Sequence, residues 1–180
     1  MNNFRPLSLK RVIAKLCNTA IRNRLYDHLL TVVRDNATGF LPGKGTRDAI
    51  TRVRGLVERA CTSGDSLIIC FIDFEKAFSS LDRRFIGKTL RYFGVDDYWI
   101  DCIYAWFIDE TYIVGDSDGV AYVKPDVGVP MGCTLAPLIF VLVLDYLFRY
   151  LRYLLRIEYN YIFSNNNNFK TQFIFNFTKF

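Results

Sequence analysis

The sequence is poor in histidine and in paired cysteines. One histidine and five cysteines occur in 180 residues, and no two cysteines form a C-x-x-C pair. The cysteines are odd in number and lie far apart, so neither a disulfide framework nor a zinc site is expected. We therefore expect an intracellular protein, nuclear or cytoplasmic, that has no disulfide partner.

Long apolar runs are also missing. The first residues, MNNFRPLSLKRVIAK, carry several charges and no apolar core of a signal peptide, so the chain is not expected to be secreted. The most apolar stretch, 135–144, is interrupted by Pro137 and followed by Asp145. It is shorter than the roughly 20 residues that cross a membrane. It predicts a buried helix and no membrane partner.

The residues that are present predict one packed domain with an uneven charge. Hydrophobic residues make up 51% and charged residues 23%, which excludes a disordered chain. The net charge is +5, yet residues 1–60 hold 12 Lys or Arg against 4 Asp or Glu, a balance of 12 − 4 = +8. Residues 61–180 hold 11 against 14, a balance of −3. A basic face of this kind suggests a polyanionic partner, although a merely soluble surface is the alternative.

Hydrophobic periodicity predicts a mixture of helices and strands. Residues 9–30 form an amphipathic basic helix, and a Gly/Pro loop at 35–46 leads to a second helix capped by Thr46. The expected inner face of that helix comprises Ala49, Ile50, Val53, Leu56, Val57 and Ala60. The apolar run 67–72 predicts a strand buried on both faces, which ends at Asp73.

The second half of the chain continues this α+β pattern. Two helices are expected at 82–93, closed by Gly94, and at 97–110, and a β-hairpin at 112–123. A second Gly/Pro-rich loop at 125–137 precedes a long apolar helix at 138–156.

The last 24 residues change in composition. Nineteen of them are Phe, Tyr, Asn, Ile or Lys, the residues whose codons are richest in A and T, and no helical or strand period is visible. We expect 157–180 to be an AT-codon-rich tail unrelated to the preceding domain. A strand pair followed by a polar tail is the alternative.

Four short segments stand in a particular order along the chain. They read N-F-R-P-L-S-L at 3–9, G-F-L-P-G-K-G-T-R-D-A-I at 39–50, F-I-D-F-E-K-A-F at 71–78 and G-V-P-M-G-C-T-L-A-P at 128–137. In this order and at these spacings, residues 2–152 resemble the reverse transcriptase domain of non-LTR retrotransposons of the LINE or jockey type.

The resemblance implies a fold and a set of boundaries. The fold would be a partial right-hand polymerase of α+β class, truncated at both ends, with fingers, an incomplete palm and no thumb. Residues 1–156 would be the partial reverse transcriptase domain, with fingers at about 1–62 and palm at about 63–156. Residues 157–180 would be a non-homologous tail.

The resemblance also assigns chemistry to the 71–78 segment. Asp73 matches the catalytic, metal-binding aspartate of the family, for which Mg²⁺ is the expected cofactor. Phe78 matches the aromatic residue that lies beneath the sugar of the incoming dNTP, and Ser79 stands where the family has Asp. Taken without the family, Asp73 is either a cap or a ligand, and Phe78 indicates a core aromatic.

Further substrate and nucleic-acid contacts follow from the same resemblance. Gly132 would let the backbone approach the nucleotide and template, and Met131 replaces a family Gln whose amide it cannot imitate. Arg5 would contact the substrate, and Lys44 and Arg47 would contact the RNA template and DNA primer. A P-loop at 39–46 is a weak alternative, since Lys44 is followed by Gly45 and not by Ser or Thr.

One expected feature is missing from the 180 residues. The family has an x-x-D-D hairpin after the loop and helix, whereas after Asp145 the sole acidic residue is Glu158, and the pair Asp96-Asp97 precedes the loop. A single carboxylate does not hold two Mg²⁺ ions, so this chain alone is expected to be inactive. The alternatives are a non-catalytic nucleic-acid-binding remnant that uses residues 1–60 and, less favoured, a membrane-associated fragment around 135–155.

Overall fold

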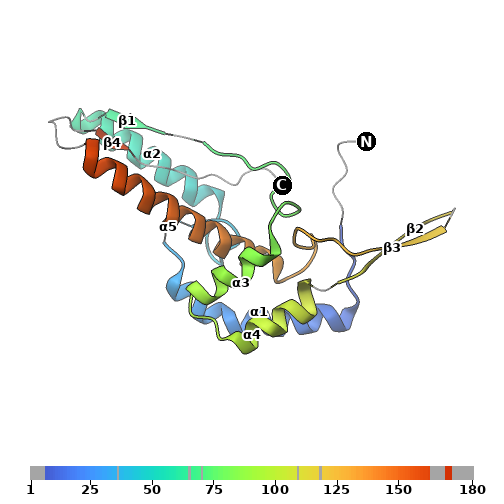
Figure 1. The fold of residues 1–180 in the computed structure, drawn as a ribbon. Helices are drawn as coiled ribbons and strands as arrows, with labels where there is room; N and C mark the ends of the chain where they lie inside the picture. The colour runs from blue at the N-terminus through green and yellow to red at the C-terminus, as the bar shows by residue number, and fades with distance from the viewer. Residues whose placement is uncertain are drawn as a thin grey trace. The chain divides into compact units, whose positions relative to one another are not determined.

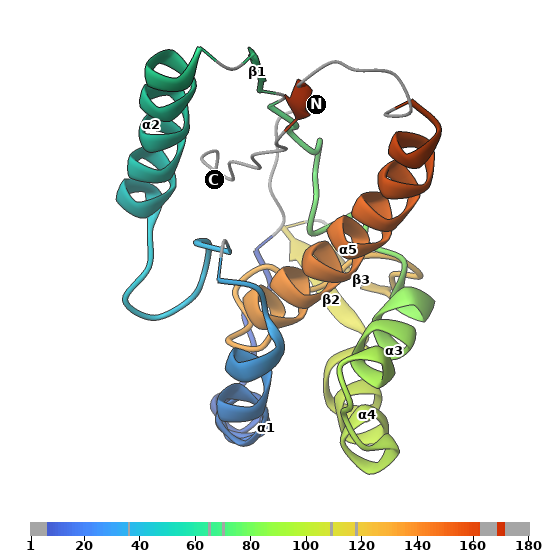
Figure 2. The same ribbon diagram turned by 90° about the vertical axis from the view of Figure 1, so that its left-hand side faces the viewer.

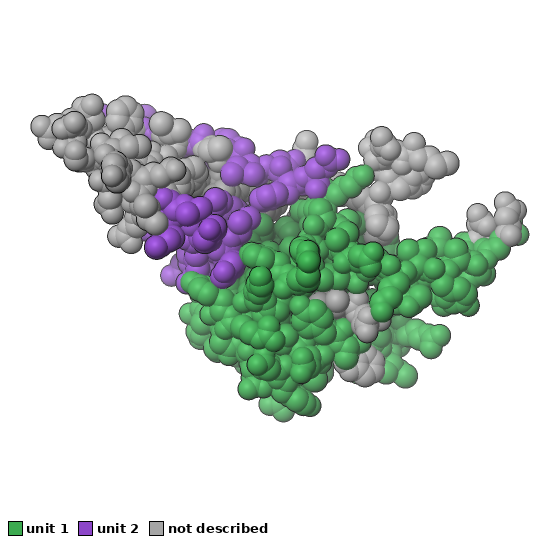
Figure 3. All heavy atoms as spheres, viewed as in Figure 1, with its two compact units in different colours: residues 1–33, 76–144 green, residues 34–75, 145–180 purple. Residues whose placement is uncertain are grey.

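A computed structural model of the chain describes residues 7–35, 37–64, 66–69, 71–108, 110–117, 119–162 and 169–171. The chain forms two compact units, each built from two separate stretches of sequence (Figure 3). Unit 1 comprises residues 1–33 and 76–144, and unit 2 comprises residues 34–75 and 145–180.

Unit 1 is mainly helical. It contains α1 (Val12–Val32), α3 (Arg83–Tyr92), α4 (Asp97–Ile103), the π-helix η1 (Tyr104–Ile108) and the start of α5 (Ala136–Ile162). Helices α3 and α4 lie side by side (Figures 1 and 2).

Local capping explains where α3 and α4 begin and end. The Asp82 carboxylate accepts a hydrogen bond from the Arg84 N–H, and the Asp96 carboxylate accepts one from the Tyr98 N–H. Gly94 has φ +77°, which lets the chain leave α3 in the left-handed region. The helix predicted at 82–93 is confirmed, while the one predicted at 97–110 changes to a π-helix at Tyr104.

The core of unit 1 confirms that 135–144 is a buried helix segment. The largest fully buried apolar side chains of this unit are Leu29, Ile86, Leu90, Ile100, Ile103, Phe107, Leu135, Ile139 and Leu142. The helix itself is longer than predicted, because α5 continues to Ile162 rather than ending near residue 156. No Gly or Pro occurs between 138 and 162 to stop it.

The predicted β-hairpin is also confirmed. Strands β2 (Tyr112–Asp116) and β3 (Gly119–Val123) pair antiparallel, with Tyr112 opposite Val123 and Asp116 opposite Gly119. All residues of β3 are exposed.

Unit 2 contains α2 (Thr46–Ser63), β1 (Ser66–Ile68), β4 (Phe169–Thr171) and the rest of α5. Strands β1 and β4 are parallel, with Ser66 opposite Phe169 and Ile68 opposite Thr171. The prediction of a strand at 67–72 buried on both faces is wrong, since β1 has three residues and Phe71 is 65% exposed.

Helix α2 corrects one further prediction. Its N-cap is Gly45, whose N–H donates to the Asp48 carboxylate at 2.7 Å, so Thr46 is the first helical residue and not the cap. The predicted inner face is covered in part: Ala49 is buried, Val53, Leu56 and Ala60 are half-buried, and Ile50 and Val57 are exposed. Apolar periodicity thus marked the less exposed side of this helix.

Within the described residues, no helix is long and apolar enough to cross a membrane.

Candidate functional site

Within unit 1, the start of the segment 128–137 is hydrogen-bonded to residues 78–83. The Gly128 N–H donates to the Leu81 carbonyl at 2.7 Å, and the Val129 N–H donates to the Phe78 carbonyl at 2.8 Å. The buried Arg83 Nε donates to the Gly128 carbonyl at 2.9 Å. These bonds satisfy the backbone of a buried turn, which would otherwise lose its hydration without compensation.

Gly128 is required by geometry at this contact. Its φ is +87°, and a Cβ on it would lie 2.6 Å from the Ser79 carbonyl oxygen. A residue with a side chain would thus meet both an unfavourable dihedral and a backbone collision.

The same segment is held on a second side by residues near the start of the chain. The Ser8 N–H donates to the Met131 carbonyl at 2.8 Å, and the Thr19 and Thr134 hydroxyl oxygens are 3.1 Å apart. Gly132 has φ +99°, and a Cβ on it would lie 2.9 Å from the Ser8 carbonyl oxygen. The backbone that approaches Gly132 in the structure is the protein's own, at Ser8. The approach of Gly132 to a nucleotide and template stays a prediction.

Phe78 lies in the core of unit 1. Its ring is buried and stacks on Phe140, with centroids 4.4 Å apart and an interplanar angle of 19°. The surroundings match the core aromatic that this residue indicates when taken alone.

Unit 1 also contains a buried ion pair that the sequence did not predict. Lys10 Nζ lies 2.9 Å from Glu110 Oε1 and 5.2 Å from the centroid of the Phe107 ring, and the Lys10 side chain is 1% exposed. Burial, followed by the nearby Glu110 carboxylate, raises the pKa of Tyr112 above its ordinary value. One hundred residues separate Lys10 from Glu110, so no local pattern could have revealed the pair.

The other sequence-predicted residues lie elsewhere. Asp73 belongs to unit 2, is exposed, and follows β1 by five residues rather than ending a long strand. Lys44 and Arg47 are exposed residues of unit 2. Arg5 lies outside the described residues.

The described residues do not by themselves provide a magnesium centre. Within that part of the chain, no three His, Cys, Asp or Glu side chains gather into a group that could hold a metal ion. Asp73 there forms no hydrogen bond or ion pair that would aim its carboxylate. Mg²⁺ keeps its water shell unless several oxygen ligands converge, so one exposed carboxylate is an incomplete donor set.

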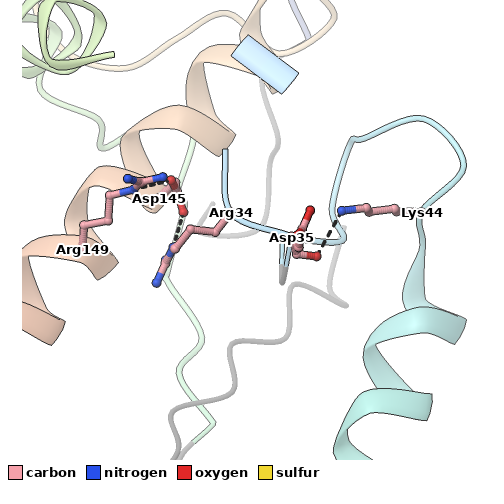
Figure 4. Close-up of polar contacts among 5 residues, drawn as sticks. All are labelled: Arg34, Asp35, Lys44, Asp145 and Arg149. Atoms are coloured by element: carbon pink, nitrogen blue, oxygen red, sulfur yellow. Dashed lines mark hydrogen bonds and ion pairs between the residues drawn. The ribbon is translucent and has the colours of Figure 1, made fainter. Parts of the chain in front are cut away.

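Unit 2 contains a basic cluster, which we define as Arg34, Lys44, Arg52 and Arg149 around two acceptors. Figure 4 shows these residues except Arg52. Asp145, 3% exposed, accepts from Arg34 Nε at 2.6 Å and from Arg149 Nε at 2.9 Å. The backbone carbonyl of Asp35 accepts from Lys44 Nζ at 3.0 Å and from Arg52 Nη2 at 3.1 Å. Sequence-based prediction found Lys44 but missed the other three cations.

The family model described as "Reverse transcriptase (RNA-dependent DNA polymerase)" matches residues 1–166. The chain therefore belongs to the reverse transcriptase family, and the resemblance to the domain of non-LTR retrotransposons is confirmed.

The curated relatives come from retrotransposable elements. The chain is 31% identical over 153 residues to the "Retrovirus-related Pol polyprotein from type-2 retrotransposable element R2DM" of Drosophila melanogaster, covering 82% of the chain and 14% of that protein. It is 27% identical over 147 residues to the corresponding polyprotein of element R2 of Nasonia vitripennis, covering 81% and 14%. A third relative, the "Transposon TX1 uncharacterized 149 kDa protein" of Xenopus laevis, is 32% identical over 91 residues, or 51% and 7%. The chain thus spans only a small part of the length of these relatives.

Proposed function

We propose that the chain forms the fingers, at about 1–62, and an incomplete palm, at about 63–156, of a non-LTR retroelement reverse transcriptase. The match of the family model over residues 1–166 carries this proposal. These boundaries follow the family segments of the sequence, with residues 157–180 assigned to a tail, while the family model itself reaches residue 166.

Within that assignment, the site residues take the roles that the resemblance implies. Asp73 would be one oxygen ligand of a Mg²⁺ centre completed by other carboxylates. Phe78 would lie beneath the sugar of the dNTP, and Met131 and Gly132 would border the nucleotide. Arg5, Lys44 and Arg47 would contact substrate and nucleic-acid phosphates.

We further propose that these 180 residues do not polymerise by themselves. No x-x-D-D segment follows 128–137, and Glu158 is the sole acidic residue after Asp145. The partners would be an RNA template, a DNA primer and dNTPs, within the nucleus or cytoplasm.

The second candidate is nucleic-acid binding without catalysis. It is favoured by the uneven charge, +8 over residues 1–60 against −3 over the remainder. Such binding would depend steeply on salt and would survive Asp73→Ala, because Asp73 lies outside the basic stretch.

Primer extension separates the two candidates. The 180-residue chain, given an RNA template, a DNA primer, dNTPs and Mg²⁺, is expected to bind but not to extend. The same chain joined to a Tyr-x-Asp-Asp segment from its own locus should extend, and Asp73→Asn should abolish that extension. Glu75→Gln, an exposed acid two residues further on, is the matched control and should retain it.

Extension by the unjoined chain would refute its proposed inactivity. Absence of any binding to RNA or DNA at low salt would refute both candidates.

A further inference from the structure

Two cations of unit 2 converge on a single uncharged acceptor. Lys44 Nζ and Arg52 Nη2 both donate to the Asp35 carbonyl oxygen, at 3.0 Å and 3.1 Å, so the two nitrogens lie within two hydrogen-bond lengths of each other. A carbonyl carries only a partial charge and cannot neutralise two cations. Within the described residues, neither side chain forms an ion pair with a carboxylate.

The neighbouring charges distinguish this pair from Arg54 of α2. The Asp48 carboxylate is engaged by the Gly45 N–H at the start of the helix. Arg54, by contrast, donates from Nε to Glu58 Oε1 at 2.8 Å, one helical turn away. One exposed arginine of α2 is therefore paired with a carboxylate, and another is left with a neutral acceptor.

The ion pair of the neighbouring residue, Arg34, restrains the Asp35 carbonyl. Arg34 donates to the Asp145 carboxylate of α5, which a second arginine, Arg149, holds through its other oxygen (Figure 4). Because Arg34 directly precedes Asp35, anchoring its side chain restrains the carbonyl on which Lys44 and Arg52 meet. The two cations are thus arranged in advance, which lowers the entropy lost when a ligand binds.

We propose that Lys44 and Arg52 form a paired phosphate-binding site for the backbone of a single-stranded nucleic acid, and that Asp145 is a positioning residue for it. This rests on the proposed function, which makes nucleic acid the partner, and it adds Arg52 and Asp145. Lys has three N–H donors and Arg has five, and each spends one on the carbonyl. The remaining donors and the uncompensated charge suit phosphate oxygens.

The test uses the whole 180-residue chain and a labelled single-stranded RNA oligonucleotide, with fluorescence anisotropy measured over a range of salt concentrations. Lys44→Ala and Arg52→Ala should each reduce the slope of log K against log salt by about 0.7, the value for one phosphate contact with a single strand. Arg54→Ala is the matched control on the same helix and should leave the slope unchanged. Lys44→Arg keeps the charge and should also leave it unchanged.

Competition with free dNTP separates the two sources of phosphate. If dNTP displaces the RNA from the wild-type chain but not from Lys44→Ala or Arg52→Ala, the pair holds a triphosphate and the assignment to a nucleic-acid backbone is overturned. Displacement that is equally weak in all variants supports the backbone assignment.

Asp145→Asn tests the positioning role. With Lys44 and Arg52 intact, its salt slope should fall by up to the summed losses of Lys44→Ala and Arg52→Ala, while circular dichroism confirms that the chain is folded. A folded Asp145→Asn chain with the wild-type slope would remove Asp145 from the proposal. Should that variant unfold, Arg34→Gln tests the same anchor from the exposed side.

Failure of this inference differs from failure of the proposed function. Binding that persists, with Lys44→Ala and Arg52→Ala indistinguishable from Arg54→Ala, overturns the paired site alone. A wild-type chain that binds no RNA at low salt overturns nucleic-acid binding as such.

Discussion

Two glycine-rich segments of this chain, 39–45 and 128–132, look alike in sequence and differ in structure. A Cβ added to Gly39, Gly43 or Gly45 would have no atom within 4 Å. A Cβ on Gly128 or Gly132 would lie within 3.0 Å of a backbone carbonyl oxygen of Ser79 or Ser8. Among the glycines of the first segment only Gly43 has a positive φ, whereas in the second Gly128 and Gly132 combine a positive φ with close backbone packing.

The two family segments also differ in how they contact the rest of the chain. Residues 128–132 are held by hydrogen bonds from Ser8 on one side and to Phe78 and Leu81 on the other. The glycines of 39–45 have open space around them, and Lys44 extends to the Asp35 carbonyl. Close backbone contacts fix residues 128–132 within unit 1, whereas the glycines of 39–45 make no such contact.

The largest effect on stability is expected at Gly128. Gly128→Ala combines φ +87° with a Cβ 2.6 Å from the Ser79 carbonyl, and Arg83 holds the adjacent carbonyl in place. The substitution should lower the free energy of unfolding by about 3 kcal/mol or more. Urea denaturation measures it, with Gly39→Ala, which has open space and no positive φ, as the control. A denaturation midpoint like that of the control would show that the Ser79 backbone can move away from the added Cβ at little cost.

A smaller loss is expected at Gly132. Gly132→Ala has φ +99°, yet its close neighbour is the Ser8 backbone, near the start of the described chain, which can shift. We expect about 1–3 kcal/mol by urea denaturation. A loss as large as that of Gly128→Ala would mean that Ser8 is held as rigidly as Ser79.

Gly43 should be less sensitive again. Its φ is +67° but the space around it is open, so Gly43→Ala meets only the left-handed backbone penalty of about 1 kcal/mol. The same denaturation series measures it, and Gly45→Ala, without a positive φ, should cost less. A loss above that of Gly132→Ala would show that the φ of Gly43 is not the sole reason for glycine at this position.

The smallest effect is a pH dependence in unit 1. Burial and the Glu110 carboxylate raise the pKa of Tyr112, so its phenol keeps its proton in the folded state when the unfolded chain begins to ionise. This contribution to stability is complete below about pH 10 and is lost as the pH rises through the folded pKa. Tyr112→Phe should flatten the alkaline part of a Tm-against-pH curve, with the exposed Tyr122→Phe as the control. Equal curves for both variants would show that ionisation of Tyr112 does not contribute to alkaline unfolding.

Elements with local signals were predicted well. The helix that begins after Asp82 and ends at Gly94, the hairpin at 112–123 and the buried helical run at 135–144 all depend on residues close in sequence. The apolar run at 67–72 was predicted wrongly, because burial of a run depends on what packs against it. The expected inner face of α2 is buried or half-buried at four of its six residues.

The candidate site divides in the same way. The match over residues 1–166 confirms the family that the sequence segments indicated, while the roles predicted for Asp73, Phe78, Gly132 and Lys44 stay predictions. The sequence could not indicate the Lys10–Glu110 pair, the Arg34–Asp145–Arg149 anchor or the meeting of Lys44 with Arg52. The first two join residues about a hundred positions apart.

By itself, the sequence determined the family, the capped helices and the basic character of the first third, since motifs, caps and charges are local properties of the chain. Only the tertiary structure decided which glycines are crowded, which apolar faces are covered and which cations lack a carboxylate. Those properties depend on the distance between residues remote in sequence, and that distance is set by how the whole chain packs.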